Sequence, residues 1–402
     1  IRDRVQAAGR SVTVLEASDG VGGRVRTDIV DGFRVDRGFQ VLLTAYPEVR
    51  RQLDLTALRL RAFDPGSMVW AAGRPWAMGD PLRKPTLAVA SGVAPFGTVA
   101  DKARLARLLW RERSADPRQL LRGPDTSTME WLTSLGFSAR IIERFFRPLL
   151  GGIQLDPDLS GSARMAETVL HCLAIGESAV PADGMQAIPA QLVQALQPDT
   201  VHLHSAVAQV SSGEVVLVDG RRVLASTVIV ATEGPAAARL LGERVADRGS
   251  RSVACVWFRA PRAPVQQKLI VLDGERCGPA LNVAVMSNVA PDYVPSDAPK
   301  GTALVAAACP SVEAGVSDDD LVQRVRTQLT GWWGQQVASW SVVSVDRIAH
   351  GQPSSVPPFA PKRAQSLGEG LWVCGDHRDT PSIQGALFSG RRCGESVVAS
   401  PA

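Results

Sequence analysis

The stretch GDHRDTPSIQGALFSGRRCGESVV, residues 375–398, decides the fold of this chain. It follows LWVC, residues 371–374, an apolar run that is typical of a buried strand. Gly375 and Asp376 end that strand, and a helix is predicted over residues 383–397. A strand, a Gly-Asp turn and a helix start of small residues place backbone N–H groups and a carboxylate around a bound polar group.

The beginning of the chain contains a matching motif. SVTVLE, residues 11–16, is a predicted strand that ends in Glu16, whose carboxylate can accept both hydroxyls of an adenosine ribose. Gly22 and Gly23 let the backbone approach a pyrophosphate, and Arg24 supplies positive charge. The alternatives are an exposed acid at a strand end and a plain Gly-Gly turn with a solvated arginine. The spacing of the two features favours two halves of one dinucleotide site at the two ends of the chain.

The composition is that of a globular protein. The 402 residues are 45% hydrophobic and 21% charged, with a formal net charge of +4. These values argue against a disordered chain and against a nucleic-acid-binding protein. No run of about 18 uninterrupted apolar residues is present, so a membrane-spanning helix is not expected.

Cysteines and histidines are scattered and show no metal-ligand spacing. There are five histidines and six cysteines, and no C-x-x-C pair occurs. We therefore predict no metal site and a reducing, cytoplasmic location, since no secretory signal precedes the first strand.

The first residues indicate a fragment of a longer gene product. Residues 1–8 are predicted to form a helix that ends at Gly9, a residue suited to a helix C-cap. A dinucleotide-binding fold needs a strand and a G-x-G-x-x-G turn before that helix. We expect one strand, one Gly-rich turn and the first part of a helix to lie upstream of Ile1.

The middle of the chain is predicted to be helical from residue 101 to residue 178. One helix, over residues 102–113, has leucines on one face and arginines on another, and it contains Trp110. It either packs its leucines inward as a lid, which is the favoured interpretation, or lies on a membrane surface. A second helix over residues 126–135 begins with an N-cap. Pro148 and the pair Gly151-Gly152 are predicted to interrupt this region.

The remaining elements are short. Residues 29–36 are predicted to form a hairpin that turns at Asp31-Gly32. Further strands are predicted over residues 201–203, 206–210, 215–218, 222–224, 228–232 and 303–308, and further helices over residues 187–196 and 318–334.

The two terminal motifs are part of a wider resemblance. VTVLEASDGVGGRVRT, residues 12–27, resembles the FAD-binding motif of the flavin-containing amine oxidase superfamily, which includes amine oxidases, protoporphyrinogen oxidases and plant-type carotenoid desaturases. Five further features match in order and cover most of the chain. They are DRGFQ at residues 36–40, VPADGMQAIP at residues 180–189 with Asp183 in place of a glycine, Val207, VIVATEGPAAARLL at residues 228–241, and the C-terminal tail.

The resemblance implies a site for non-covalent FAD. Asp376 would bind the ribityl-pyrophosphate region, and N–H groups of residues 383–386 would face the N1/O2 side of the flavin. A helix N-terminus at that place stabilises the negative charge of a reduced flavin. The residues assigned to the cofactor are Glu16, Gly22, Gly23, Arg24, Gly38, Phe39, Gln40, Val207, Ala231, Gly375, Asp376, Ser382, Ile383, Gln384 and Ala386.

The implied fold is α/β with α+β inserts. A Rossmann-like FAD-binding domain would comprise residues 1–77, 180–248 and 346–402. A substrate-binding and lid domain of mixed sheet and helices, residues 78–179 and 249–345, would be interleaved with it.

Departures from the family pattern concern the substrate. Ser382 occupies the tail position where amine oxidases of this group place one aromatic residue of an amine cage. The segment before the tail lacks the cysteine that attaches flavin covalently in some of them. Lys268 and Lys300 are candidates for a flavin-proximal lysine, although surface lysines are the favoured interpretation. His350 and His377 are not assigned a catalytic role, and no catalytic residue is identified.

The implied activity is hydride transfer from a substrate C–H bond to flavin. We expect desaturation of an apolar, isoprenoid-like small molecule, because the tail is closest to that of plant-type carotenoid desaturases. The alternatives are a flavin amine oxidase and a flavin-binding protein without catalysis. Oxygen and a quinone are both open as electron acceptor, and peripheral contact of a cytoplasmic protein with a membrane surface is open as well.

Overall fold

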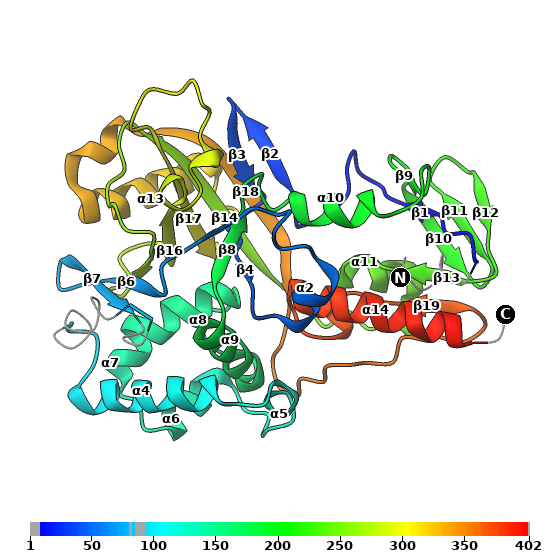
Figure 1. Ribbon diagram of the computed structural model, residues 1–402, viewed down its shortest axis with the longest axis horizontal. Coiled ribbons are helices and arrows are strands. Elements are labelled where there is room, and N and C mark those ends of the chain that lie inside the picture. Colours follow the sequence, from blue (N-terminus) through cyan, green and yellow to red (C-terminus); the bar gives the residue numbers. More distant parts are fainter. Residues whose placement is uncertain (1–8, 80–82, 85–93, 401–402) are drawn as a thin grey trace.

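The computed structural model describes residues 9–79, 83–84 and 94–400. The helix predicted over residues 1–8 lies outside the described residues. Figure 1 shows a large sheet and a group of helices at one end of the molecule, and small strand groups with the C-terminal helix at the other. This mixed α/β architecture confirms the predicted fold class.

Two pairs of parallel strands bring the ends of the chain together. They are β1 (Val14–Leu15) with β9 (Val201–His202), and β13 (Val228–Val230) with β19 (Leu371–Val373). The apolar residues of β13 and β19 pack against each other, as a buried parallel pair requires. The helices that follow these two strands are α11 (Gly234–Leu241) and α14 (Ile383–Ala399).

An antiparallel group adjoins these pairs. It consists of β10 (Val207–Ser211), β11 (Glu214–Leu217) and β12 (Arg222–Leu224). The turn between β11 and β12 contains Gly220 at φ +87°, a conformation that glycine adopts without strain.

A seven-stranded mixed sheet forms the other end of the molecule (Figure 1). In spatial order its strands are β18 (Ser341–Pro353), β14 (Ser250–Ala260), β17 (Ala303–Pro310), β16 (Asn282–Val285), β15 (Ile270–Asp273), β6 (Gly66–Ala71) and β7 (Arg74–Gly79). All neighbours are antiparallel except β15 and β6. One face packs against α13 (Asp318–Trp333), which continues into η5 (Gly334–Ser339).

Helices cover the opposite side of β6 and β15. They are α4 (Val99–Arg113), α5 (Pro117–Leu120), α6 (Thr128–Ser134), α7 (Ala139–Ile141), the π-helical turn η2 (Ile142–Phe146), α8 (Arg147–Ile153) and α9 (Ala163–Ile175). Capping boxes start two of them, Thr98 with Asp101 at α4 and Ser127 with Glu130 at α6.

The predicted interruption at Pro148 and Gly151-Gly152 is wrong. These residues lie inside α8, where Pro148 is in the first turn and therefore costs no backbone hydrogen bond. A Cβ on Gly152 would come within 1.9 Å of Nδ2 of Asn282, so this glycine allows α8 to approach the sheet. The glycines serve close packing rather than a break.

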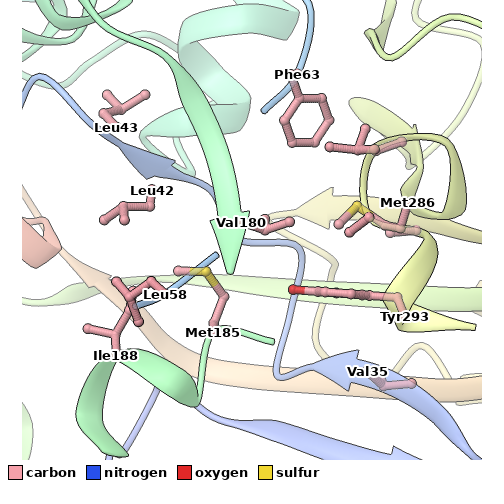
Figure 2. Close-up of a cluster of buried hydrophobic side chains, with 14 of the residues drawn as sticks. Val35, Leu42, Leu43, Leu58, Phe63, Val180, Met185, Ile188, Met286 and Tyr293 are labelled. Atoms are coloured by element: carbon pink, nitrogen blue, oxygen red, sulfur yellow. The ribbon is translucent and has the colours of Figure 1, made fainter. Parts of the chain in front are cut away.

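Small elements and one shared core connect the two ends of the molecule. The elements are β2 (Thr27–Val30), β3 (Phe33–Asp36), β4 (Leu42–Leu43), α2 (Pro47–Gln52), β5 (Leu60–Ala62), β8 (Ser178–Pro181), α10 (Ala187–Gln194), η3 (Gly242–Arg244), α12 (Met286–Val289), η4 (Pro291–Tyr293) and η6 (Asp376–Arg378). Figure 2 shows Leu42, Val180 and Met185 meeting Met286 and Tyr293 in that core.

Candidate functional site

A large cavity of about 1690 Å³ runs through the molecule. It extends from β1 and β10 past the turn before α14 to the helices α4, α8 and α9. Of the fifteen residues assigned to the cofactor, all line this cavity except Gln384. The structure therefore brings together segments that the sequence separates by hundreds of residues.

The N-terminal motif and the tail are joined directly by an ion pair. Nη2 of Arg24 lies 2.8 Å from Oδ2 of Asp376, whose side chain is almost fully buried. Arg24 also donates to the carbonyl of Gly351. Because both side chains line the cavity, they present one guanidinium and one carboxylate to its wall.

Glu16 lies at the end of β1, where a ribose is expected. Its Oε1 accepts hydrogen bonds from the amide of Ser18 at 2.9 Å and from the Ser18 hydroxyl at 2.8 Å. These bonds fix the carboxylate beside the cavity, while Val207 lines the same end.

The glycine-rich turn is held against two other motifs. Gly22 has φ +113°, and a Cβ there would come within 2.8 Å of Cγ of Pro189. Gly23 has φ +57° and open space beyond its Cα. The side chain of Gln40 donates from Nε2 to the carbonyls of Arg24, at 2.7 Å, and Arg37, at 2.9 Å. The turn thus presents bare backbone to the cavity, as an approaching phosphate requires.

The start of α14 agrees with the predicted anion-facing helix start but differs in detail. Ser382 is the N-cap: its hydroxyl accepts from the amide of Gly385 at 3.1 Å, and its carbonyl accepts from the amide of Ala386 at 3.0 Å. Two of the four N–H groups expected to face the flavin are therefore occupied within the helix. The amides of Ile383 and Gln384 remain for a ligand.

The side chain of Gln384 does not belong to the cavity. Its Oε1 accepts a hydrogen bond from the amide of Glu48 at 2.8 Å, so the side chain docks α14 onto α2. The predicted cofactor contact at this position is the backbone N–H group of Gln384, and that contact stays a prediction.

An aromatic side chain that sequence reasoning missed, Tyr46, lies beside Ser382. Tyr46, next to α2, lines the cavity within hydrogen-bonding reach of Ser382, and burial raises the pKa of its hydroxyl. Phe39 and Phe63 also line the cavity and meet edge to face at 6.3 Å. An aromatic group is therefore present near the tail, although the tail itself does not supply it.

Neither of the two lysine candidates lies on the cavity wall. Lys268 and Lys300 are exposed, and neither lines the cavity. Among the described residues that line it, the lysine is Lys102 of α4, whose pKa is lowered by burial and whose ammonium lies 5.4 Å from the ring centre of Phe96. No sequence motif marks this position.

The cavity fits FAD on the geometry of its own residues. The cavity wall contains a fixed carboxylate, a bare glycine turn, an arginine and a helix start with two N–H groups, which are the groups that an adenosine ribose, a diphosphate and a flavin require. No cysteine lines the cavity within the part of the chain that is described, and the cysteines are free thiols.

Asp36 ends β3 directly before the cavity-lining segment that begins at Arg37. It accepts hydrogen bonds from the Thr27 hydroxyl at 2.5 Å, the amide of Met185 at 2.9 Å and the Tyr293 hydroxyl at 2.7 Å. Figure 2 shows Tyr293 pointing toward Met185 in this core. Burial raises the pKa of Asp36 from 3.8 to about 6, because the hydrogen bonds only partly offset desolvation.

This shift predicts a pH-dependent difference between the protein and its Asp36→Asn variant. Since the folded state holds the Asp36 proton more tightly than the unfolded chain, the contribution of Asp36 to stability is greatest below pH 3.8 and is lost as pH rises through 6. We expect the free energy of unfolding of the variant, minus that of the protein, to rise by up to about 3 kcal/mol between pH 4 and pH 7. Urea unfolding across this range measures it, and a constant difference would contradict the account.

Two absences bear on the site. Among residues 9–79, 83–84 and 94–400, no group of three or more His, Cys, Asp or Glu side chains is arranged to hold a metal ion. Within the same ranges, no helix combines the length and apolar character needed to cross a bilayer.

Comparisons with known proteins agree with this geometry. The family model described as flavin containing amine oxidoreductase matches residues 4–398. No curated protein matches the chain. An oxidoreductase from Methanosarcina mazei has a TM-score of 0.75 at 15% identity, covering 99% of this chain and 96% of that one. A putative protoporphyrinogen oxidase from Exiguobacterium has a TM-score of 0.68 at 16% identity, covering 98% of this chain and 95% of that one. Cyclohexylamine oxidase from Brevibacterium oxydans has a TM-score of 0.69 at 16% identity, with the same two coverages. At these identities the solved structures establish the fold.

Proposed function

The chain belongs to the flavin-containing amine oxidoreductase family and is an FAD-dependent oxidoreductase, and from that premise we propose that it dehydrogenates an apolar, isoprenoid-like small molecule. The bound flavin supplies the two-electron acceptor for hydride removed from a substrate C–H bond. The chain supplies position, exclusion of water and electrostatic stabilisation.

The apolar wall of the cavity is the observation that supports this substrate class. The half of the cavity beyond Ser382 is enclosed by side chains of α4, η2, α8 and α9. They are Leu105, Ala106, Leu109, Phe145, Leu149, Met165, Val169, Leu170 and Leu173. Burial of a matching hydrocarbon against these side chains would give binding energy without a dedicated polar group.

The assigned residues would hold the cofactor as follows. The Glu16 carboxylate would accept ribose hydroxyls, and Arg24 with the backbone of Gly22 and Gly23 would face the diphosphate. The amides of Ile383 and Gln384, at the start of α14, would stabilise negative charge on the flavin. Forming a C=C bond would transfer one hydrogen as hydride to the flavin and release the second, from the adjacent carbon, as a proton to water or to a basic group of the cavity.

Amine oxidation is the second candidate, and one observation favours it. Phe39, Tyr46 and Phe63 all line the cavity, and aromatic faces attract amines. We rank this function second because the side chains of α4, η2, α8 and α9 that line the cavity are mostly apolar, with Lys102 as an exception, and a small amine would leave much of the cavity unfilled.

Peripheral membrane contact stays a prediction. The outer face of α4 exposes Trp110 to 66% and carries Arg107, while Leu105 and Leu108 face the protein. The leucine face therefore packs inward, as the lid interpretation predicts.

Anaerobic reduction of the bound flavin separates the two candidates. Purified full-length protein is mixed without oxygen with isoprenoid hydrocarbons in detergent or with primary amines and polyamines, and the yellow flavin absorbance is followed. We expect bleaching by an isoprenoid and none by amines. Bleaching by amines alone, with peroxide formed when air is admitted, would replace the proposed function by amine oxidation.

The cavity wall can be tested with a matched pair of variants on α4. Ala106 lines the cavity and Ala103 is exposed on the same helix without lining it. We expect Ala106→Trp to raise the KM of the substrate that bleaches the flavin about tenfold, because the indole fills space that the substrate needs. Ala103→Trp is expected to leave KM unchanged. Equal effects of the two variants would show that this wall does not contact the substrate.

A further inference from the structure

A second, small pocket lies behind the Arg24–Asp376 pair and contains an unpartnered histidine. His377 is 8% exposed, and neither Nδ1 nor Nε2 of its ring has a hydrogen-bond partner among the described residues. The ring lines a pocket with a volume of about 20 Å³, which is space for roughly one water-sized species. A buried imidazole with two unsatisfied nitrogens is costly unless a ligand or solvent molecule contacts it.

Two glycines make room for the imidazole. A Cβ on Gly375 would come within 2.7 Å of Nδ1 of His377, and a Cβ on Gly234 would come within 3.2 Å of Cβ of His377. The ring is therefore held between the turn that follows β19 and the start of α11, and the start of α11 borders the small pocket.

The groups around His377 carry an excess of positive charge. Arg24, Arg248 and Arg363 line the pocket, and Arg378 lies close enough to act on the same groups. Arg24 is paired with Asp376, whereas Arg363 donates only to the carbonyls of Ala360 and His377 within the described part of the chain. Burial and the neighbouring guanidiniums of Arg248 and Arg378 lower the pKa of Arg363 to about 10.

The other polar groups of the pocket do not remove this excess. Glu233 and Asp247 line its rim, and Asp247 accepts a hydrogen bond from the amide of Gly249. His350 lies on the far side and is bonded through Nδ1 to the Ser250 hydroxyl at 2.6 Å. Two rim carboxylates thus balance the two lining arginines that Asp376 does not pair, and the remaining positive charge is that of Arg378.

A helix N-terminus opens onto the same pocket. α11 begins at Gly234, and its N-cap Glu233 makes no side-chain capping bond. Pro235 has no N–H group, so the first turn of α11 offers fewer backbone N–H donors than usual, and no side chain caps those that remain. The helix dipole adds positive potential at the same place.

We propose that the pocket formed by His377, Arg248, Arg363 and the start of α11 binds a small inorganic anion, either chloride or one oxygen of phosphate. The anion accepts a hydrogen bond from the His377 ring and neutralises the arginines around the turn that carries Asp376. The site is separate from the FAD cavity, with Arg24 and Glu233 forming the shared wall.

The size of the pocket decides the class of ligand. About 20 Å³ admits a monatomic anion or a single oxygen, but not a whole diphosphate or an organic acid. The cofactor diphosphate is the other source of anion chemistry nearby, and the experiment must distinguish the two.

Ring nitrogen NMR of His377 tests the proposal in FAD-saturated, full-length protein. Burial, opposed by Asp376 and reinforced by Arg378, Arg363 and Arg24, lowers the pKa of His377 to about 4. Anion binding favours the imidazolium, so chloride or phosphate should shift the His377 ring signal and raise its pKa. Gluconate at equal ionic strength, which is too large to enter, should do neither. The ring signal that is absent from the spectrum of the His377→Asn variant is the signal of His377.

A matched pair of arginine variants locates the site. Arg248 and Arg244 are both exposed and lie four residues apart, but only Arg248 lines the pocket. We expect Arg248→Gln to raise the apparent Kd for chloride about tenfold, and Arg244→Gln to leave it unchanged. Thermal unfolding against chloride at constant ionic strength gives the same Kd independently of NMR.

Each outcome decides the proposal. An anion response that vanishes when FAD saturates the protein would assign the effect to the diphosphate site and overturn the inference. The same holds for equal effects of the two arginine variants, or for a His377 signal that responds to no anion. Because no readout depends on the substrate, the result is independent of the proposed function.

Discussion

The Gly385→Ala variant is expected to bind FAD about 100-fold more weakly than the unsubstituted protein. A Cβ at residue 385 would lie 1.8 Å from the carbonyl oxygen of Thr380 and 2.6 Å from its hydroxyl. Neither atom can move without displacing the turn that precedes α14, so the helix start must shift away from the cavity. Overpacking of this kind costs about 1–3 kcal/mol, and here the displaced atoms include the amides proposed to face the flavin.

Gly390 provides the control in the same helix. A Cβ at Gly390 meets no atom within 4 Å, so Gly390→Ala adds a methyl group without a clash. It should leave the FAD Kd unchanged and stabilise α14 by up to about 1 kcal/mol. Titration of both proteins with FAD, followed by flavin fluorescence, gives the comparison. If Gly385→Ala binds FAD as well as Gly390→Ala does, the start of α14 does not contact the flavin.

The Arg24→Gln variant is expected to lose FAD affinity to a similar extent, about 100-fold. It removes a guanidinium from the cavity wall and leaves Asp376, 6% exposed, without its partner at 2.8 Å. An unpaired carboxylate then faces the diphosphate with the same sign of charge, and breaking such a largely buried pair costs about 3 kcal/mol.

A double substitution separates the two contributions. Adding Asp376→Asn to Arg24→Gln removes the unpaired charge, and we expect it to restore FAD affinity about tenfold relative to Arg24→Gln alone. Arg347→Gln is the control, since Arg347 pairs with Asp318 in an exposed position and its loss should not change the FAD Kd. No recovery in the double variant would mean that Arg24 and Asp376 act on the cofactor independently.

Much of the fold could be predicted because local chemistry specified it. Ser127 and Glu130 form the capping box that starts α6, and Asp31-Gly32 turns the hairpin of β2 and β3. The tail was predicted to be a strand, a Gly-Asp turn and a helix, and β19, η6 and α14 follow in that order. In each case the residues that determine the element are neighbours in the sequence.

The remaining features depend on contacts between distant segments. Pro148 and Gly152 resemble a break until the neighbouring Asn282 is known, because only then does the glycine have a packing role. Two contacts could not be predicted for the same reason: the Gln384 side chain bonds to α2, and Tyr46 comes from beside α2 to meet Ser382. Periodicity and motif spacing contain no information about such partners.

The small pocket illustrates the same limit. Asp376 and His377 are adjacent in the sequence but lie at different sites. Asp376 lines the FAD cavity and pairs with Arg24, whereas His377 lines only the second pocket. The sequence assigned no role to His377. The turn at Gly375, with φ +145°, directs the two side chains to different sites.

Equilibrium dialysis of FAD against the full-length protein tests the central claim most directly, namely that the N-terminal motif and the C-terminal tail form one FAD site. We predict saturable binding of one FAD per chain, released unmodified by acid because no cysteine lines the cavity among the described residues. An absence of saturable FAD binding would contradict the account.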